Sequence, residues 1–277
     1  MGERRYEEKP HAVSYQKYRV SPQEVVEKVM AFLEKRIKTA KPFNLALDVG
    51  CGSGQGTVLL APHFTHVVGT DISAAMLEFA LASDHPPNIS YRQCPAEQLP
   101  FDDGAADLVT AMTAAHWFDR PRFLQEAQRL LRPGGCLALL SYTMDFQLEH
   151  RGDCNAQLNA ICQEFYAALL PYRSTHIGSS SLLLYKQMYD SIPYEDKEWQ
   201  ECFQVRRKMP LSSYMRMVET FTSYQALLKK DPLESQKLSQ DITNKLVSAM
   251  GVASPEAEVT VVVNYFYLLA CKPTTTK

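Results

Sequence analysis

The chain has 277 residues, of which 45% are hydrophobic and 22% charged, an ordinary globular composition that excludes disorder as a class. Its 29 Lys and Arg residues against 31 Asp and Glu give a net charge of −2, so the basic excess typical of a nucleic-acid binder is missing. The length fits one large domain or two small ones.

The seven cysteines include no C-x-x-C pair, which argues against a zinc ribbon or a thioredoxin-type redox motif. We therefore expect a reducing compartment, no metal site, and cysteines that serve mostly as small buried hydrophobes. The most apolar run, Val259–Cys271, is too short to span a bilayer and suits a buried strand. These features predict a cytoplasmic protein without a membrane segment.

The first predicted element is a helix that follows an irregular polar segment. Ser21 suits the N-cap, Pro22 suits the first helical position, and Glu24 completes a capping box. Apolar residues from Val26 to Ile37 then recur at helical spacing. Residues 1–42 are therefore predicted to form an N-terminal arm and a helix.

Strands and helices are predicted to alternate within residues 43–150. Short apolar runs alternate with segments of helical periodicity, two of which begin at the capping residues Ser73 and Asp119. This alternation predicts right-handed strand–helix–strand units around a parallel sheet. The five strands are expected at 45–49, 66–70, 89–93, 107–112 and 136–142.

The second half has a different pattern. Residues 151–250 are predicted to hold a helical cap and a sixth strand, and residues 251–277 a final strand. Helices are expected at 153–170, 211–229 and 233–250, a strand at 198–208, and a loop or cap in the mixed segment 171–198. Gly251 is placed like a glycine that ends a helix.

A glycine-rich loop, Asp48-Val-Gly-Cys-Gly-Ser-Gly, follows the first predicted strand. Glycines let a ligand lie against bare backbone, and the N-terminus of the next helix favours an anionic group. The third glycine of the dinucleotide fingerprint is missing in every register, and no P-loop lysine follows. Asp71 lies 21 residues after Gly50, where a carboxylate can accept hydrogen bonds from ribose hydroxyls.

Four motifs together resemble class I S-adenosylmethionine-dependent methyltransferases of the type 11 subgroup. They are Asp48-Val-Gly-Cys-Gly-Ser-Gly, Gly69-Thr-Asp-Ile-Ser, Ala96-Glu-Gln-Leu-Pro-Phe-Asp-Asp-Gly and Leu131-Arg-Pro-Gly-Gly, in the family's order over about 90 residues. The resemblance implies an α/β fold: a Rossmann-like, seven-stranded, mostly parallel sheet with helices on both faces. The helical cap is then inserted before the last strand.

The resemblance also implies that the cofactor is S-adenosyl-L-methionine and assigns residues to it. Asp48 and the loop glycines would hold its methionine part, and Asp71 its ribose. Ile72 would pack on the adenine, and the Ala96–Glu97 step would lie along its edge. Pro95 stands where many relatives have Asp. The implied cofactor residues are Asp48, Gly50, Gly52, Gly54, Asp71, Ile72, Ala96 and Glu97.

Looser motifs around Tyr15 to Arg19, His116-Trp-Phe-Asp and Thr220-Phe-Thr-Ser-Tyr resemble the trans-aconitate and cantharidin methyltransferase group. Phe221 stands where that group usually has Trp. That group methylates carboxylates of small molecules, so the resemblance implies a small-molecule acceptor, with carboxylates among the candidates. Tyr18 and Trp117 are the candidate substrate-binding residues.

The catalytic candidate is His116, expected at the end of the fourth strand and facing the transferred methyl group. A hydroxyl or amine acceptor gains from a general base, whereas a carboxylate is already ionised at neutral pH. The same histidine can instead only line or order the pocket. The oligomeric state stays open, and so does the identity of the acceptor.

Three other functions stay open. A protein methyltransferase shares the same cofactor residues. A nicotinamide-dependent oxidoreductase shares the fold class, although the failed dinucleotide register argues against it. A non-catalytic cofactor-binding module is the third alternative. Nucleic-acid methylation is not expected, because the Thr113-Ala-Ala-His-Trp segment lacks the Asp/Asn-Pro-Pro-Tyr/Phe tetrad of exocyclic-amine methyltransferases.

Overall fold

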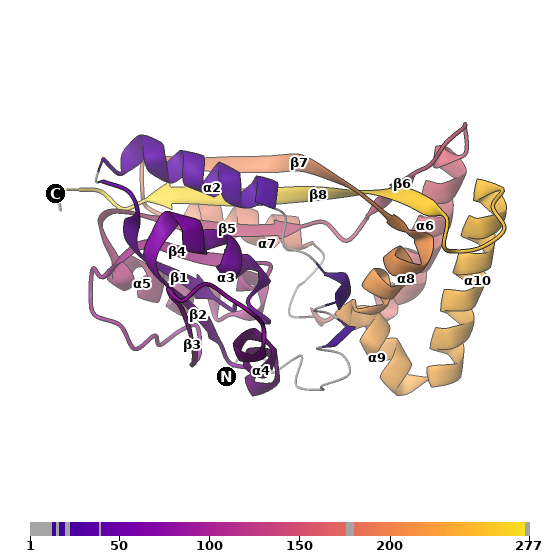
Figure 1. Ribbon diagram of the computed structural model, residues 1–277, viewed down its shortest axis with the longest axis horizontal. Coiled ribbons are helices and arrows are strands. Elements are labelled where there is room, and N and C mark those ends of the chain that lie inside the picture. Colours follow the sequence, from indigo (N-terminus) through magenta and orange to yellow (C-terminus); the bar gives the residue numbers. More distant parts are fainter. Residues whose placement is uncertain (1–12, 15–16, 20–22, 39, 176–179, 275–277) are drawn as a thin grey trace.

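A computed structural model describes residues 13–14, 17–19, 23–38, 40–175 and 180–274 of the chain. Within these ranges, eight strands form one sheet with helices on both faces and a group of helices at one end (Figure 1). The predicted fold class, a mostly parallel Rossmann-like sheet with a helical cap before the last strand, is confirmed. The predicted helix start at Ser21 and Pro22 lies outside the described residues.

Five strands build the parallel part of the sheet, in the order β3-β2-β1-β4-β5. Because each is followed by a helix or loop that returns over the sheet, their carboxyl ends share one edge. They are β1 (Phe43–Val49), β2 (Phe64–Asp71), β3 (Ile89–Gln93), β4 (Ala106–Met112) and β5 (Leu131–Tyr142).

The long strand β8 (Glu258–Cys271) joins this sheet antiparallel to β5. Strand β7 (Lys197–Pro210) pairs with nearly the whole length of β8. Short β6 (Gln147–Glu149) pairs with the part of β8 beyond the end of β5, so β5 and β6 share one edge of β8 and β7 occupies the other. The sheet therefore has eight strands where seven were predicted. The additional strand is β6, which forms because the chain after β5 pairs with β8 a second time.

Helices cover both faces of the sheet and make two separate cores. Helices α2 (Gln23–Arg36) and α3 (Gln55–Leu60) pack on one face. Helices α5 (Arg120–Leu130) and α7 (Ser181–Ser191) pack on the other, and α4 (Ala74–Ala82) lies against β2 and β3. Alternate residues of each strand enter opposite cores, as the two-residue period of a strand requires.

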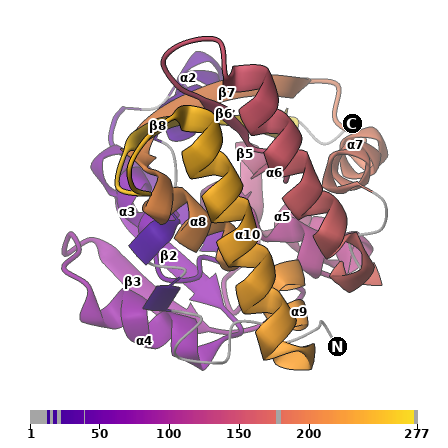
Figure 2. The ribbon, with the colours of Figure 1, turned by 90° about the vertical axis from the view of Figure 1, so that its right-hand side faces the viewer.

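The cap consists of four helices that pack around a third core beyond the end of the parallel sheet (Figure 2). They are α6 (Asn155–Leu169), α8 (Leu211–Glu219), α9 (Thr222–Lys230) and α10 (Pro232–Met250). The far parts of β7 and β8 extend along the upper edge of the molecule to these helices, so the sheet connects the two halves of the molecule (Figure 1).

Local sequence signals set the ends of several helices. The Ser73 hydroxyl accepts a hydrogen bond from the Met76 N–H, and the Asp119 carboxylate accepts one from the Arg122 N–H, as N-caps do. Gly251 ends α10 in the left-handed conformation. The described residues also form three short 3₁₀ segments, η1 (Ala61–His63), η2 (Ala115–Trp117) and η3 (Leu170–Tyr172).

Three elements differ from the sequence prediction. Helix α7 lies in the segment read as a loop or cap and packs against the core sheet through Tyr185 and Met188. The single helix expected at 211–229 is two helices, because the chain leaves helical geometry at Phe221. Strand β5 begins directly after α5, ahead of the Pro133-Gly134-Gly135 turn.

The expectation that most cysteines are buried hydrophobes is wrong. Cys136 and Cys271 lie opposite each other in the β5–β8 ladder and form a disulfide. Of the five free cysteines, Cys162 alone is buried and Cys202 is exposed. The pairing escaped prediction because 135 residues separate the two cysteines.

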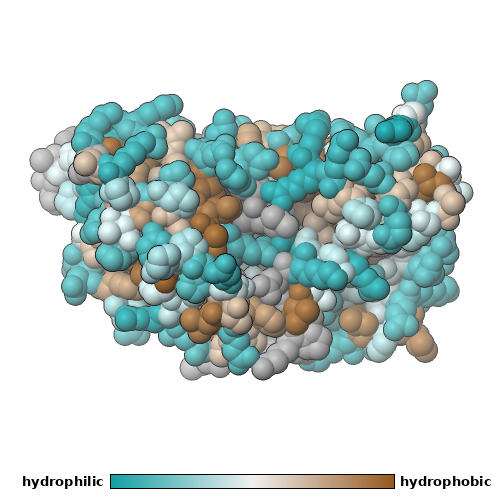
Figure 3. Space-filling view, in the orientation of Figure 1, coloured by the Kyte–Doolittle hydropathy of each residue, from teal (hydrophilic) through white to brown (hydrophobic). Residues whose placement is uncertain are grey.

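Polar side chains cover most of the face shown in Figure 3, and apolar residues gather there only in small patches. In the described part of the chain, no helix combines the length and apolar character needed to cross a membrane.

Candidate active site

The loop after β1 has a backbone conformation that its glycines permit and that hydrogen bonds to β2 hold. Gly50, Gly52 and Gly54 have φ values of 70°, 55° and 82°, a region that residues with side chains rarely adopt. The N–H groups of Gly50 and Cys51 both donate to the Thr70 carbonyl, at 2.7 and 2.9 Å. A Cβ on Gly50 would lie 2.5 Å from that of Ala114, so a side chain is excluded there by space as well.

Asp48, the last polar residue of β1, is almost completely buried, with 1% of its surface exposed. Its Oδ2 accepts a 2.6 Å hydrogen bond from the Thr57 hydroxyl, and its Oδ1 has no partner. The pKa of Asp48 is raised to about 6, chiefly by burial and in part by the nearby Asp71 carboxylate, against the lowering effect of the Thr57 hydrogen bond. A buried acceptor without a partner is costly, so this oxygen is suited to a cationic ligand group.

Asp71 ends β2 and ties the glycine loop to the next helix. Its Oδ2 accepts a hydrogen bond from the Gly52 N–H and its Oδ1 accepts one from the Ser73 N–H, both at 2.8 Å. The carboxylate thus fixes the backbone on both sides of the cavity edge. Each carboxylate oxygen has capacity for further hydrogen bonds, including those from ligand hydroxyls.

Two hydrogen bonds position the segment after β3. The Gln93 amide donates to the Ile72 carbonyl at 3.0 Å. Glu97 Oε1 accepts from the Asp119 N–H at 2.8 Å, which ties the Ala96–Glu97 step to the start of α5. These contacts bring three separate segments of the chain to one side of the cavity.

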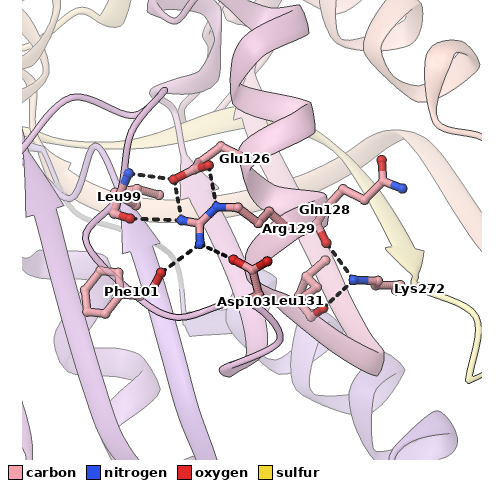
Figure 4. Close-up of polar contacts among 8 residues, drawn as sticks. All are labelled: Leu99, Phe101, Asp103, Glu126, Gln128, Arg129, Leu131 and Lys272. Carbon is pink, nitrogen blue, oxygen red and sulfur yellow. Dashed lines mark hydrogen bonds and ion pairs between the residues drawn. The ribbon is translucent and has the colours of Figure 1, made fainter.

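Arg129 of α5 fixes the far end of the same segment (Figure 4). Its guanidinium donates to the carbonyls of Leu99 and Phe101, at 3.0 and 2.8 Å, and it forms ion pairs with Glu126 and Asp103, both at 2.7 Å. Glu126 in turn accepts from the Leu99 N–H at 2.7 Å. This network, which we call the Arg129 clamp, holds the loop that carries Ala96 and Glu97.

These segments surround a cavity of about 760 Å³ between the parallel sheet and the cap. It is lined by nine of the eleven residues singled out from the sequence: Tyr18, Asp48, Gly50, Gly52, Asp71, Ile72, Ala96, Glu97 and Trp117. Gly54 faces away from it, toward Tyr91, whose hydroxyl lies 2.3 Å from a Cβ built on that glycine.

His116 is the second predicted residue outside the cavity lining. It sits in η2, where its Nδ1 lies 3.4 Å from the Tyr185 hydroxyl of α7 and its ring lies 4.8 Å from that of Trp117. The expected orientation toward the cavity is therefore not observed. The short 3₁₀ turn after β4 directs Trp117 to the cavity and His116 to α7, which the sequence did not reveal because α7 itself was not predicted.

Sequence reasoning missed Thr113, which also lines the cavity. Its φ of 59° is uncommon for a residue with a branched Cβ. The Thr113 N–H donates to the Leu140 carbonyl at 2.7 Å and extends the pairing of β4 with β5 by one residue. Strained backbone of this kind concentrates at functional sites. The sequence around Thr113 does not predict this positive φ, because glycine is the residue that usually marks such a conformation.

The other end of the cavity, which we call the cap end, has a wall of alternate strand residues. They belong to β5, β7 and β8 and all lie on the same face of the sheet, as the two-residue period requires. The cap adds side chains above them. The strand residues are Leu140, Tyr142, Val205, Arg207, Met209, Val261, Val263 and Tyr265, and Phe146 and Met217 face them from the cap side.

Charge is divided between the two ends. The acidic residues of the cavity wall come from the loops after the parallel strands, which we call the loop end: Asp48, Asp71, Glu97 and Asp119. Of the arginines in the described lining, Arg122 lies beside Asp119 at the loop end, whereas Arg19 and Arg207 lie at the cap end. Arg19 is 8% exposed, its Nε donates to the Thr220 hydroxyl at 2.8 Å, and its guanidinium lies 4.7 Å from the Phe221 ring. The cavity therefore favours a cation at one end and an anion at the other.

Comparison with known proteins identifies the segment that carries the loop end. Residues 47–139 match the family model described as a methyltransferase domain. Over 99 residues the chain is 44% identical to a protein of Dictyostelium discoideum named as a methyltransferase, covering 36% of each chain. It is 39% identical over 102 residues to trans-aconitate 2-methyltransferase of Deinococcus radiodurans, covering 36% of this chain and 38% of the relative.

A third relative, malonyl-[acyl-carrier protein] O-methyltransferase of Hahella chejuensis, is 40% identical over 111 residues, which cover 37% of this chain and 39% of the relative. The matched segments thus span little more than a third of these curated relatives. Every residue named above as part of the cap end lies outside the matched family segment.

Solved structures extend the likeness of fold over most of the chain. A protein from Anaeromyxobacter dehalogenans described as a type II methyltransferase has a TM-score of 0.72 at 22% identity, covering 92% of this chain and 98% of that one. Phosphoethanolamine N-methyltransferase 2 of Haemonchus contortus has a TM-score of 0.52 at 18% identity, covering 96% of this chain and 57% of that one.

Proposed function

We propose that this chain, whose residues 47–139 form a methyltransferase domain, is an S-adenosyl-L-methionine-dependent methyltransferase that acts on a small molecule. The observation that carries the proposal is the unpartnered, buried Oδ1 of Asp48 beside the glycine loop. This oxygen and the glycines that leave the loop open are what an amino-acid moiety with an ammonium group requires.

The other residues of the loop end fit the remaining parts of this cofactor. Gly50 and Gly52 leave room for a ligand beside the backbone. Because their N–H groups already donate to Thr70 and Asp71, the start of α3 is the part that can accommodate a carboxylate. Asp71 would accept hydrogen bonds from the ribose. Ile72, Ala96 and Glu97 would lie against the adenine. Gly54 would serve the site only indirectly, because its close neighbour is Tyr91.

When bound, S-adenosylmethionine supplies a methyl group that is already activated by a positively charged sulfur. The enzyme then has chiefly to align the acceptor, and alignment alone contributes up to about 7–11 kcal/mol in well-fixed geometries. The acidic residues of the loop end balance the cofactor's positive charge. Trp117 and Phe118 exclude water from one wall of the cavity.

The acceptor that this cavity favours is a carboxylate. At the cap end, the titratable groups of the described lining are tyrosines and arginines, with no carboxylate or histidine to act as a base near neutral pH. A carboxylate acceptor is ionised at pH 7 and needs no base. The relative named trans-aconitate 2-methyltransferase supports an acidic small-molecule acceptor.

Incubation with S-adenosylmethionine that carries a labelled methyl group tests the proposal. The label should appear in members of a panel of small carboxylic acids and not in matched amines or alcohols. Transfer only to added protein or RNA would overturn the small-molecule acceptor. Absence of S-adenosylmethionine binding by calorimetry would overturn the function itself, including its reading as a cofactor-binding module. Binding of NAD in its place would favour an oxidoreductase.

A further inference from the structure

Arg207 of β7 is a charged residue on the face of the sheet that lines the cap end of the cavity. Among the described residues of β5, β7 and β8 that line the cavity, it alone carries a charge. Its neighbours on the same face of β7 are Val205 and Met209, and Val261 lies opposite it on β8. Placing a guanidinium among apolar side chains costs free energy unless an anionic partner is available.

The structure gives Arg207 a weak protein partner. Its Nη2 lies 3.9 Å from Oε2 of Glu24 on α2, beyond hydrogen-bond distance, and half of the Glu24 side chain is exposed. Exposed ion pairs of this kind contribute little. Arg207 itself keeps 29% of its side-chain surface exposed. The guanidinium is therefore desolvated in part but not neutralised by a close, well-aligned carboxylate.

The preceding residue provides an internal comparison. Arg206 points to the opposite face of β7, as the strand period requires, and does not line the cavity. Its guanidinium contacts both carboxylate oxygens of Glu149, at 3.3 and 3.4 Å, on the protein surface. Strand β7 thus carries Arg206, which is paired with a carboxylate, next to Arg207, which faces the cavity.

The wall around Arg207 indicates the rest of the ligand. Tyr142 and Tyr265 lie side by side, with ring centroids 5.6 Å apart, and the Met209 and Met217 side chains line the same region. Aromatic and thioether groups favour an apolar chain or ring. The acidic residues of the lining belong to the loop end, which leaves the cap end positive.

We propose that Arg207 is a specificity-determining residue that binds an anionic group of the acceptor, and that the acceptor is a small organic acid with an apolar body. Arginine holds a carboxylate through two parallel hydrogen bonds, which a neutral group of the same shape cannot match. The inference rests on the proposed function, because it assigns the cap end to the methyl acceptor.

Calorimetry with two matched pairs of probes tests it: octanoate against octanamide, and 3-phenylpropanoate against 3-phenylpropanamide. Each pair differs in charge but hardly in shape. In the wild type each acid should bind at least tenfold more tightly than its amide. Arg207→Gln should bring the two affinities within twofold while the amide binds as before. Arg206→Gln, the matched control, should keep the wild-type ratio.

Two results overturn the inference. One is a wild type that fails to bind these acids or does not prefer them over the amides. The other is an Arg207→Gln protein that keeps the preference. Unchanged amide binding serves as the check that the variant is folded. If that variant does not fold, Arg207→Lys, which keeps the charge but loses the planar fork, should give a preference smaller than the wild type, and an unreduced preference contradicts the assignment.

Titration with S-adenosylmethionine separates this inference from the proposed function. Arg207→Gln should bind the cofactor as the wild type does, because the loop end is unchanged. A wild type that binds acids selectively but not S-adenosylmethionine would overturn the methyltransferase proposal and leave Arg207 as an acid-binding residue. A wild type that binds S-adenosylmethionine without distinguishing acids from amides would overturn only the inference about Arg207.

Discussion

The loop end of the cavity is made from turns that follow parallel strands, and hydrogen bonds between those turns hold it. Asp71 links the glycine loop to α4, and Glu97 links the segment after β3 to α5. The cap end is made from the flat face of antiparallel strands, with side chains supplied from three distant segments. The first end depends on backbone geometry and the second on side-chain identity. Substitutions at the two ends should therefore change different ligands.

Asp71→Ala is expected to have the largest effect. It removes the charged acceptor of two backbone hydrogen bonds, each worth about 1.5–3 kcal/mol, together with the proposed ribose contact. S-Adenosylmethionine affinity measured by calorimetry should fall by about a hundredfold or more, and octanoate affinity should not change. Asp84→Ala, at an exposed aspartate before β3, is the control. Equal cofactor affinity in both variants would contradict the proposed division of the cavity.

Asp48 should make cofactor binding depend on pH. Its pKa of about 6 lies above the ordinary 3.8, so its contribution to stability is present in full below pH 3.8 and is lost as pH rises through 6. The loss is about 3 kcal/mol in the empty protein. A ligand ammonium favours the ionised carboxylate, so S-adenosylmethionine affinity should fall about tenfold per pH unit below 6.

Asp48→Asn is the reference for that experiment. It should bind S-adenosylmethionine more weakly at pH 7 and with little change between pH 5 and 7. A wild-type affinity that is flat over this range would exclude Asp48 as the ammonium partner. The free energy of unfolding of the wild type relative to Asp48→Asn should also decrease from pH 5 to pH 7, measured without ligand.

The Arg129 clamp predicts a smaller, indirect effect. Arg129→Gln leaves the carbonyls of Leu99 and Phe101 without their donors and should lower the free energy of unfolding by about 2 kcal/mol. Cofactor affinity should fall several-fold, because the loop that carries Ala96 and Glu97 is released. Acid binding at the cap end should stay the same.

Lys272→Gln is a matched control for the clamp. Lys272 donates to the carbonyls of Gln128 and Leu131, beside the same helix but away from the loop (Figure 4). It should lower the melting temperature without changing cofactor affinity. If both variants weaken cofactor binding equally, Arg129 acts on stability alone.

His116→Ala should have the smallest effect. Because His116 faces Tyr185 and does not line the cavity, the rate of labelled-methyl transfer to the preferred acid should change less than about threefold. Removing a general base would instead cost about 10²–10⁴-fold. A loss of transfer rate in that range would show that His116 reaches the acceptor and would support the sequence-based hypothesis that it is a general base.

The same contrast explains which features the sequence predicted. The loop end is encoded locally: glycines mark the turn, and carboxylates at strand ends meet at one edge of a parallel sheet. Asp71 was therefore found from its position, and Asp48 and Glu97 from the family resemblance of the motifs around them. At the cap end, Arg207 reaches the cavity only through the pairing of β7 with β8, a contact between residues far apart in the chain. Local pattern carries no information about such pairing.

The fold shows a similar limit. The five parallel strands were predicted nearly in full because their βαβ alternation repeats. Helix α7 was missed because the segment around it reads as mixed, and local pattern does not show its packing on the sheet, where Tyr185 contacts Phe266 of β8. His116 was assigned to the cavity for the same reason, since its neighbour Tyr185 had not been placed.

The pairing of Pro210 with Glu258 closes the outer end of the β7–β8 ladder and sets the helices between them apart from the sheet. Residues 211–257 leave and rejoin the sheet at one point, as the loop of a very long hairpin does. This helical segment can be exchanged as a cassette without disturbing the order of the strands or the loops of the other end. Of the described residues that line the cavity, this segment contributes Met217 to the cap end and none to the loop end.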